Sequence, residues 1–171
     1  NFLMKKNKIT VINGTGKLAR GKKVVVTDAD GKKSELSADH IIIATGGRAK
    51  ELPSLPIDGK KIIGYREAMT LAKQPKKMVV VGAGAIGVEF AYFYNSIGTE
   101  VTVVEYMKQG LLPREDADIS KELGKIYKKA GMKVMADSAV TSVDIKGKGC
   151  KVSVKGNKDG KEEVIECDIV L

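Results

Sequence analysis

The clearest pattern in the chain is a short apolar run that leads into a glycine-rich turn and an apolar helix. Residues 78–81 are apolar and mostly β-branched, as in a buried parallel strand. A turn follows over residues 82–87, then a segment of helical character to Ile97 and a second apolar run over 101–104 that ends on Glu105. Strand, G-x-G-x-x-G, helix, strand and terminal acid together predict a dinucleotide-binding β-α-β unit.

Each glycine of this turn has a physical role in such a unit. Gly82 permits the tight turn, Gly84 lets a pyrophosphate approach the backbone, and Gly87 lets the helix pack closely on the strand. The helix start offers free N–H groups and partial positive charge to phosphates. Glu105 would accept hydrogen bonds from ribose hydroxyls and repel a 2′-phosphate, which favours NAD over NADP. The alternative is a glycine turn with a structural role alone. The predicted site also includes Ala83, Ile86 and Val88.

The segment before this unit has the pattern of a β-rich region joined by a loose connection. We expect strands at residues 9–12, 23–27, 34–36 and 41–44, and then a glycine turn at 44–47. Pro53 and Pro56 lie in the connection, and a short helix is expected over residues 66–72, with Tyr65 at its weak start.

The segment after the unit predicts a further helix and strands. A helix is expected over residues 116–130 with Gly131 as its stop. Four apolar residues at helical spacing predict its buried face: Ile119, Leu123, Ile126 and Ala130. A third parallel strand is expected at 133–135, an antiparallel meander at 140–145, 151–154 and 163–165, and a last strand from Ile169. The fold class is therefore α/β: a Rossmann-like parallel sheet with helices on both faces and an antiparallel β-meander, after a β-rich tail.

Two stretches of the chain repeat one another. Asp30-Gly31-Lys32 precedes Asp39 and the apolar run 41–43, and Asp159-Gly160-Lys161 precedes Asp168 and the run 169–171 at the same spacing. The repeat predicts that the opening region is the tail of an earlier β-α-β unit, and that a turn resembling 44–46 follows Leu171. The alternative is that two hairpins share a turn by chance.

Composition narrows the class of protein. The net charge is +9, but the lysines are scattered and Trp is absent, so a solvated basic surface is favoured over a nucleic-acid site. No apolar run approaches the roughly 20 residues of a membrane span. Cys150 and Cys167 lack C-x-x-C spacing, and we expect reduced thiols, a structural His40 and no metal site. The chain opens on Asn1 without a signal pattern, so we expect an excised piece of a cytoplasmic protein.

These motifs resemble those of the FAD-dependent pyridine nucleotide–disulfide oxidoreductases. The supporting stretches are Ala44-Thr45-Gly46-Gly47-Arg48, Leu55-Pro56-Ile57-Asp58-Gly59, residues 82–89, residues 101–105 and Leu111-Leu112-Pro113-Arg114-Glu115-Asp116. The resemblance covers the whole chain but only the middle of the family's architecture. It implies that residues 1–50 are the end of a FAD-binding domain and that residues 51–171 are a NAD-binding domain.

The resemblance also implies roles for individual residues. Ala44, Thr45 and Gly46 match the turn that closes on FAD, and Gly16 matches a position beside the flavin's adenine. Ala85 matches the position that faces the nicotinamide and the flavin, Glu89 an acid near the carboxamide, and Val140 a residue beside the NAD adenine. Val140 could equally be an ordinary core residue, and Glu89 a solvated helix residue.

The nearest branch of the family oxidises protein-bound dihydrolipoamide, passing electrons from a dithiol to an enzyme disulfide, FAD and NAD⁺. The reactive C-x-x-x-x-C pair and the His-Glu acid/base pair of that branch are absent from this sequence. The resemblance therefore implies a NAD platform with no catalytic residues of its own, an incomplete FAD site, and two partners: a lipoyl domain of a 2-oxo-acid dehydrogenase complex and a second copy. Alternatives are another NAD-linked flavoprotein (an NADH oxidase or a transhydrogenase), a non-catalytic nucleotide-binding module and, least favoured, a nucleic-acid-binding protein.

Overall fold

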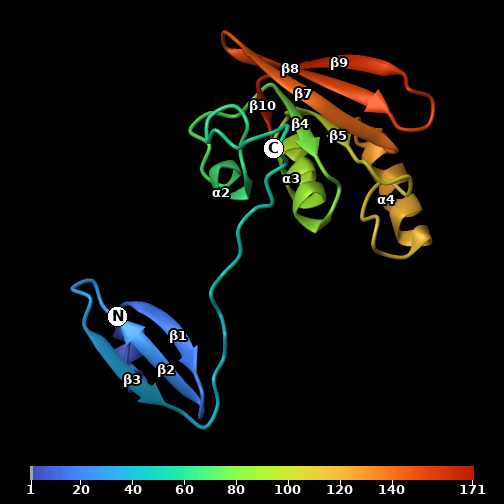
Figure 1. The fold of residues 1–171 in the computed structure, drawn as a ribbon. Coiled ribbons are helices and arrows are strands. Elements are labelled where there is room, and N and C mark those ends of the chain that lie inside the picture. Colours follow the sequence, from blue (N-terminus) through green and yellow to red (C-terminus); the bar gives the residue numbers. More distant parts are fainter. Residues whose placement is uncertain (1) are drawn as a thin grey trace. The chain divides into compact units, whose positions relative to one another are not determined.

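The computed structural model describes residues 2–171, and the chain divides after Gly47 into two compact units (Figure 1). The amino-terminal unit holds α1 (Phe2–Lys6) and an antiparallel sheet of β1 (Thr15–Ala19), β2 (Lys23–Thr27) and β3 (Lys33–Ser37), in that order. Val26 is the buried apolar side chain of this sheet. The assignment of residues 1–50 and 51–171 to a FAD-binding and a NAD-binding domain stays a prediction.

Part of the expected strand pattern of this unit is wrong. Residues 9–12 and 41–44 form no strand, whereas β1 and α1 were not expected. An extended run needs a neighbouring strand to satisfy its backbone groups, and residues 41–44 have no such neighbour among residues 2–171. The side chains of Ile42 and Ile43 are accordingly 90% and 67% exposed.

A four-stranded parallel sheet forms the centre of the carboxyl-terminal unit. Its order is β10 (Ile169–Val170), β4 (Lys77–Val81), β5 (Glu100–Val104) and β6 (Lys133–Met135). The middle residues of β4 are almost completely buried, as the apolar run predicted. The expected third strand and the strand starting at Ile169 are confirmed.

One face of this sheet is covered by the helices α2 (Tyr65–Ala68), α3 (Ala85–Ser96) and α4 (Ala117–Lys129). Two buried tyrosine hydroxyls tie the helices together: Tyr94 donates to the carbonyl of Ala68 and Tyr127 to the carbonyl of Val88, both at 2.5 Å. Helix α2 is shorter than expected and begins after Gly64, whose N–H donates to a Glu67 carboxylate oxygen at 2.9 Å.

The other face is covered by the meander β7 (Ser138–Lys146), β8 (Gly149–Gly156) and β9 (Glu162–Cys167). Alternate residues of β8, Cys150, Val152 and Val154, pack with Val79 and Val104 of the sheet. The α/β class, the parallel sheet and the meander are confirmed. The expectation of helices on both faces is wrong in one respect. The connection from β6 to β10 runs through the meander, so strands cover the second face.

The buried face of α4 also differs from the prediction. Ile119 and Ile126 are 55% and 50% exposed, whereas Ser120 and Tyr127 are each only 3% exposed. Both buried residues have hydroxyl groups that donate to carbonyls. A polar side chain can be buried without a large penalty when its hydrogen bond is made, so a search for apolar spacing alone selects the wrong face. The helix stop at Gly131, with φ +82°, is confirmed.

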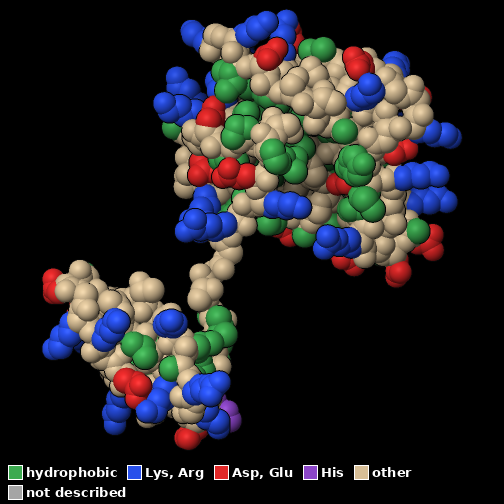
Figure 2. Space-filling model, viewed as in Figure 1, with side chains coloured by type: hydrophobic (Ala, Val, Ile, Leu, Met, Phe, Trp, Pro, Cys, Tyr) green, Lys and Arg blue, Asp and Glu red, His purple; other side chains and the backbone are tan. Residues whose placement is uncertain are grey.

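The surface of the carboxyl-terminal unit is mixed in charge. On the face shown in Figure 2, Lys and Arg side chains lie around the rim among Asp and Glu, and hydrophobic side chains lie nearer its middle. Over residues 2–171, none of the helices has both the length and the apolar character needed to cross a membrane.

Candidate functional site

The glycine turn lies at the carboxyl end of β4, where the chain passes into α3 (Figure 1). Gly82 has φ +99°, a left-handed conformation that side chains other than glycine's rarely adopt. Its N–H donates to the carbonyl of Val104 at 2.8 Å, which ties the turn to the adjacent strand β5. The tight turn expected of Gly82 is therefore present.

Gly87 is required by packing inside the protein. A Cβ at this position would lie 2.0 Å from the carbonyl oxygen of Gly82 and 3.4 Å from a methyl group of Val80. Any side chain would push α3 away from β4. The close packing of α3 on β4 that the sequence predicted for Gly87 is therefore present.

Gly84 differs from the other two glycines because nothing in the protein requires it. Its φ is −69°, an ordinary value, and an added Cβ would meet no atom within 4 Å. Gly84 is exposed and forms the N-cap of α3. The open space over its Cα is a cradle that a Cβ would fill, and a pyrophosphate lying against the backbone is the group that fits it.

The first turn of α3 presents unpaired backbone N–H groups beside this space. The first backbone bond of the helix joins the N–H of Val88 to the carbonyl of Gly84 at 3.0 Å. The N–H groups of Ala85, Ile86 and Gly87 precede it and have no acceptor within the helix, and no side chain caps them. Together with the helix dipole they form an anion-binding end.

Glu105 lies next to this turn because β5 pairs with β4 in parallel register up to Val81 and Val104. Its side chain is 6% exposed. One carboxylate oxygen accepts the N–H of Ala83 at 2.6 Å, and the other accepts the N–H of Met107 at 2.7 Å. Each oxygen has a further lone pair, so the carboxylate can support the turn and still accept a ribose hydroxyl.

The remaining predicted residues of the carboxyl-terminal unit fall in three places. Ala85 and Glu89 are exposed on α3, Glu89 in its second turn, while the side chains of Ala83 and Val88 are buried in the core. Val140 of β7 is half-buried against the apolar cluster beneath the meander, as its alternative core role requires. Its place beside an adenine stays a prediction.

The residues predicted for FAD lie in the amino-terminal unit. Gly16 is on β1 opposite Val26 of β2. Ala44, Thr45 and Gly46 are exposed in a segment without regular structure, where Gly46 has φ +81°. Their role toward FAD stays a prediction.

A second support of the glycine turn, which the sequence did not predict, comes from Leu112. The N–H of Leu112 donates to the carbonyl of Ala83 at 2.8 Å, so Glu105 and Leu112 hold the Ala83 residue through its N–H and its carbonyl. Leu112 has φ +50°, an uncommon conformation for leucine. The segment Leu111-Leu112-Pro113 belongs to the stretches that carry the family resemblance, but nothing in its residue types indicates a contact with the turn.

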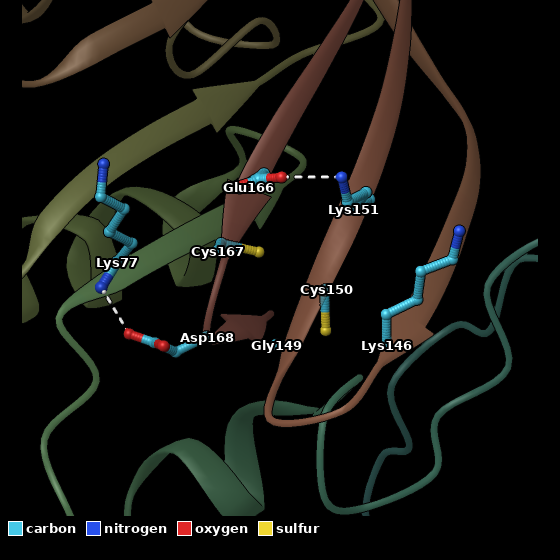
Figure 3. Close-up of a pocket in the computed structure, with 8 residues that line it drawn as sticks. All are labelled: Lys77, Lys146, Gly149, Cys150, Lys151, Glu166, Cys167 and Asp168. Atoms are coloured by element: carbon cyan, nitrogen blue, oxygen red, sulfur yellow. Dashed lines mark hydrogen bonds and ion pairs between the residues drawn. The ribbon is translucent and has the colours of Figure 1, made fainter.

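A separate pocket of about 330 Å³ lies at the other end of β4 (Figure 3). Cys150 and Cys167 face one another across β8 and β9, and both thiols are free and buried. Burial, followed by the neighbouring Cys150, raises the pKa of Cys167 to about 12, and burial raises the pKa of Cys150 as well. Neutral thiols are poor nucleophiles, so this pair is unreactive near neutral pH. Lys151 and Glu166 form an ion pair at 2.8 Å on its rim.

Residues 2–171 include no cluster of three or more His, Cys, Asp or Glu side chains placed to hold an ion. The glycine turn has the strand, turn and helix geometry that the sequence predicted for a β-α-β unit. The family model described as pyridine nucleotide-disulphide oxidoreductase matches residues 1–171. The chain belongs to this family, and the resemblance noted in its sequence is confirmed.

Individual relatives narrow the comparison. The chain is 41% identical over 169 residues to a leghemoglobin reductase of Glycine max and to the mitochondrial dihydrolipoyl dehydrogenase of Pisum sativum. Those alignments cover 99% of this chain and 32% and 34% of the relatives. It is 42% identical over 159 residues to the dihydrolipoyl dehydrogenase of Zymomonas mobilis, covering 93% of this chain and 34% of that protein. The chain thus spans about a third of the length of the curated relatives that it matches.

Solved structures give the same fold. LpdA of Mycobacterium tuberculosis matches with a TM-score of 0.78 at 31% identity, over 98% of this chain and 37% of that one. The water-forming NADH oxidase of Lactobacillus brevis, solved with NADH bound, matches with a TM-score of 0.64 at 25% identity, over 87% of this chain and 33% of that one.

Proposed function

We propose that this chain is the NAD-binding portion of a FAD-containing dihydrolipoyl dehydrogenase. In this proposal it places NAD⁺ to accept a hydride from reduced FAD while the whole enzyme oxidises dihydrolipoamide. The observation that carries the proposal is Gly84, whose missing side chain leaves a cradle with no structural use inside the protein. Relatives named dihydrolipoyl dehydrogenase, about 40% identical over nearly the whole chain, support the choice of branch.

The residues around the turn have distinct roles in this proposal. The N–H groups of residues 85–87 would bind the pyrophosphate, and the open backbone at Gly84 would allow it to lie close. Glu105 would accept the adenosine ribose hydroxyls and disfavour a 2′-phosphate. NAD, when bound, supplies the hydride acceptor, and Ala85, exposed at the start of α3, would leave room for the nicotinamide to meet the flavin.

The chain by itself would bind NAD(H) weakly and catalyse nothing, because the residues that handle the dithiol are not in its sequence. In the whole enzyme, the partners would be a lipoyl domain of a 2-oxo-acid dehydrogenase complex and a second copy of the same polypeptide. A cytoplasmic location is part of this proposal, although the relative from Pisum sativum is named as mitochondrial.

Titration of the chain with NADH tests the cofactor site. Gly84→Val should weaken NADH binding at least about 100-fold by filling the cradle. Tm should fall only slightly, because valine is a poorer N-cap than glycine but the φ at this position is ordinary and the space is empty. Gly124→Val is the matched control, since Gly124 lies in α4 and an added Cβ there also meets nothing within 4 Å. Unchanged NADH affinity in Gly84→Val would contradict the proposed site.

A parallel titration with NADPH tests the role of Glu105. Wild-type chain should bind NADPH more weakly than NADH, because the carboxylate repels a 2′-phosphate at the ribose. Glu105→Gln should narrow the difference. Equal or tighter binding of NADPH by the wild-type chain would remove Glu105 from the ribose site and leave the choice of cofactor without support.

A second candidate, an NADH oxidase, is favoured by the similarity to the Lactobacillus brevis enzyme. Both candidates would use the same NAD-binding portion. They differ in the second compound, besides NAD(H), with which the flavin exchanges electrons. The spacing of redox cysteines elsewhere in the natural polypeptide separates them, since dihydrolipoamide oxidation needs a C-x-x-x-x-C pair beside the flavin.

A further inference from the structure

A buried serine on α4 fastens the loop that holds the glycine turn. Ser120 is 3% exposed, and its hydroxyl lies 2.9 Å from the carbonyl oxygen of Gln109 and 2.5 Å from that of Leu111. Both carbonyls belong to the loop between β5 and α4. Ser120 belongs to none of the motifs that the sequence displays.

From this loop, hydrogen bonds continue to the turn itself. Leu112, next to Leu111, donates its N–H to the carbonyl of Ala83 at 2.8 Å. The N–H of Ala83 is held in turn by Glu105 at 2.6 Å. Ser120, Leu112, Ala83 and Glu105 therefore form a continuous chain of hydrogen bonds and peptide units from α4 to the phosphate-facing backbone.

The loop is held in a conformation that it would not keep without support. Leu112 has φ +50°, and non-glycine residues in this region persist where their surroundings fix them. Leu111 is 1% exposed and anchors the loop in the core, while Ser120 fixes its carbonyl direction. The N–H of Leu112 is aimed at Ala83 only while both constraints hold.

We propose that Ser120 is a positioning residue for the dinucleotide, acting through Leu112 and Ala83 on the glycine turn. This inference rests on the proposed NAD site and adds to it a residue that touches no ligand. With the hydroxyl removed, the carbonyls of Gln109 and Leu111 lose the one O–H that lies within reach of both. Leu112 is released from its left-handed conformation, and Ala83 keeps its hydrogen bond to Glu105 but loses the one from Leu112. The glycine turn is then less well preorganised, and the affinity for the dinucleotide falls because binding must first order the turn.

The test compares two variants that each remove one buried hydroxyl. Ser120→Ala removes the loop anchor. Thr99→Val removes a hydroxyl that is 1% exposed and donates to the carbonyl of Pro75 at 2.8 Å, at the amino end of β5. Both should lower Tm. Ser120→Ala should raise the Kd for NADH about 3- to 10-fold, and Thr99→Val should leave it within about 2-fold of wild type. Wild-type affinity in Ser120→Ala, or an equal loss in Thr99→Val, would overturn the proposal.

Hydrogen exchange of the ligand-free chain separates this inference from the proposed function. In Ser120→Ala the amide of Leu112 should exchange at least about 10-fold faster than in wild type, because its bond to Ala83 opens more often. Unchanged protection of Leu112 would overturn the positioning role even if wild-type chain binds NADH. Faster exchange with no NADH binding by wild type would instead refute the proposed cofactor site and leave Ser120 a purely structural anchor, which also overturns the proposal.

Discussion

The two ends of β4 differ in whether the protein supplies acceptors for the backbone N–H groups that lie there. At the carboxyl end, the amides of Ala85 to Gly87 open onto empty space over Gly84. At the amino end, one carboxylate oxygen of Asp168 accepts the N–H groups of Lys76 and Lys77 at 2.8 and 2.9 Å. Figure 3 shows the contact between Asp168 and Lys77. The same strand therefore has its amino end closed by a carboxylate of the protein, whereas the N–H groups after its carboxyl end have no side-chain cap.

The chemistry around the two ends differs accordingly. The closed end carries Cys150 and Cys167, whose raised pKa values keep both thiols neutral near pH 7. The open end carries Glu105, whose carboxylate accepts two backbone N–H groups beside the turn. The polar contacts of Glu105 thus lie beside the uncapped N–H groups, whereas Cys150 and Cys167 pack in the apolar cluster beneath the meander.

The largest expected effect is on the free energy of unfolding, and it distinguishes Gly87, which packing requires, from Gly84, which packing does not require. Gly87→Ala should lower the free energy of unfolding by at least about 3 kcal/mol, because its Cβ would lie 2.0 Å from a backbone oxygen that cannot move aside. Gly84→Ala, the control, should change it by less than about 0.5 kcal/mol. Urea denaturation followed by circular dichroism measures both. Equal stabilities would mean that α3 moves freely on β4.

A smaller effect is expected at the closed end. Asp168→Ala should cost about 2 kcal/mol, because two backbone N–H groups lose a charged acceptor. Asp39, its counterpart in the sequence repeat, is exposed, so Asp39→Ala should cost less than about 0.5 kcal/mol. Thermal unfolding of the two variants gives the comparison. If both substitutions cost the same, Asp168 does not close this end of the strand.

The smallest expected effect is a dependence on alkaline pH. The pKa of Cys167 is raised from 9.0 to about 12, so between these values the folded chain keeps a proton that the unfolded chain releases. Stability therefore falls as pH rises above 9, by about 1 kcal/mol or less at pH 10 from this group, because solvent screens part of the shift. Urea midpoints at pH 8 and pH 10 measure the loss, and Cys167→Ala should reduce it. A midpoint loss as large in Cys167→Ala as in wild type would assign the effect to other groups.

The sequence predicted the central unit well because its signals are local. A β-branched run, a glycine turn and an acid after the next strand specify their own conformations, and Gly82, Gly87 and Glu105 lie where the spacing places them. The Asp-Gly turns of the repeat are equally local. Asp28 accepts the N–H groups of Asp30 and Lys32, Asp159 accepts that of Lys161, and each turn joins strands of a three-stranded antiparallel sheet.

The features that the sequence did not predict depend on distant partners. Ile119 and Ile126 have the right spacing for a buried face, but the carbonyls that accept hydrogen bonds from Ser120 and Tyr127 lie on other segments. The role of Leu112 likewise depends on the carbonyl of Ala83, which only folding brings near. Residues 41–44 show the converse, an apolar run without a neighbouring strand.

The two tyrosine hydroxyls that join α3 to its neighbours make the protein its own optical probe. The chain has five tyrosines and no tryptophan, so its near-ultraviolet absorbance comes mainly from phenol rings. Burial raises the pKa of Tyr94 and of Tyr127, while Tyr92 and Tyr106 are exposed. An alkaline absorbance titration should therefore show a late phase from Tyr94 and Tyr127. The late phase would report, without any label, whether α2, α3 and α4 are still packed together.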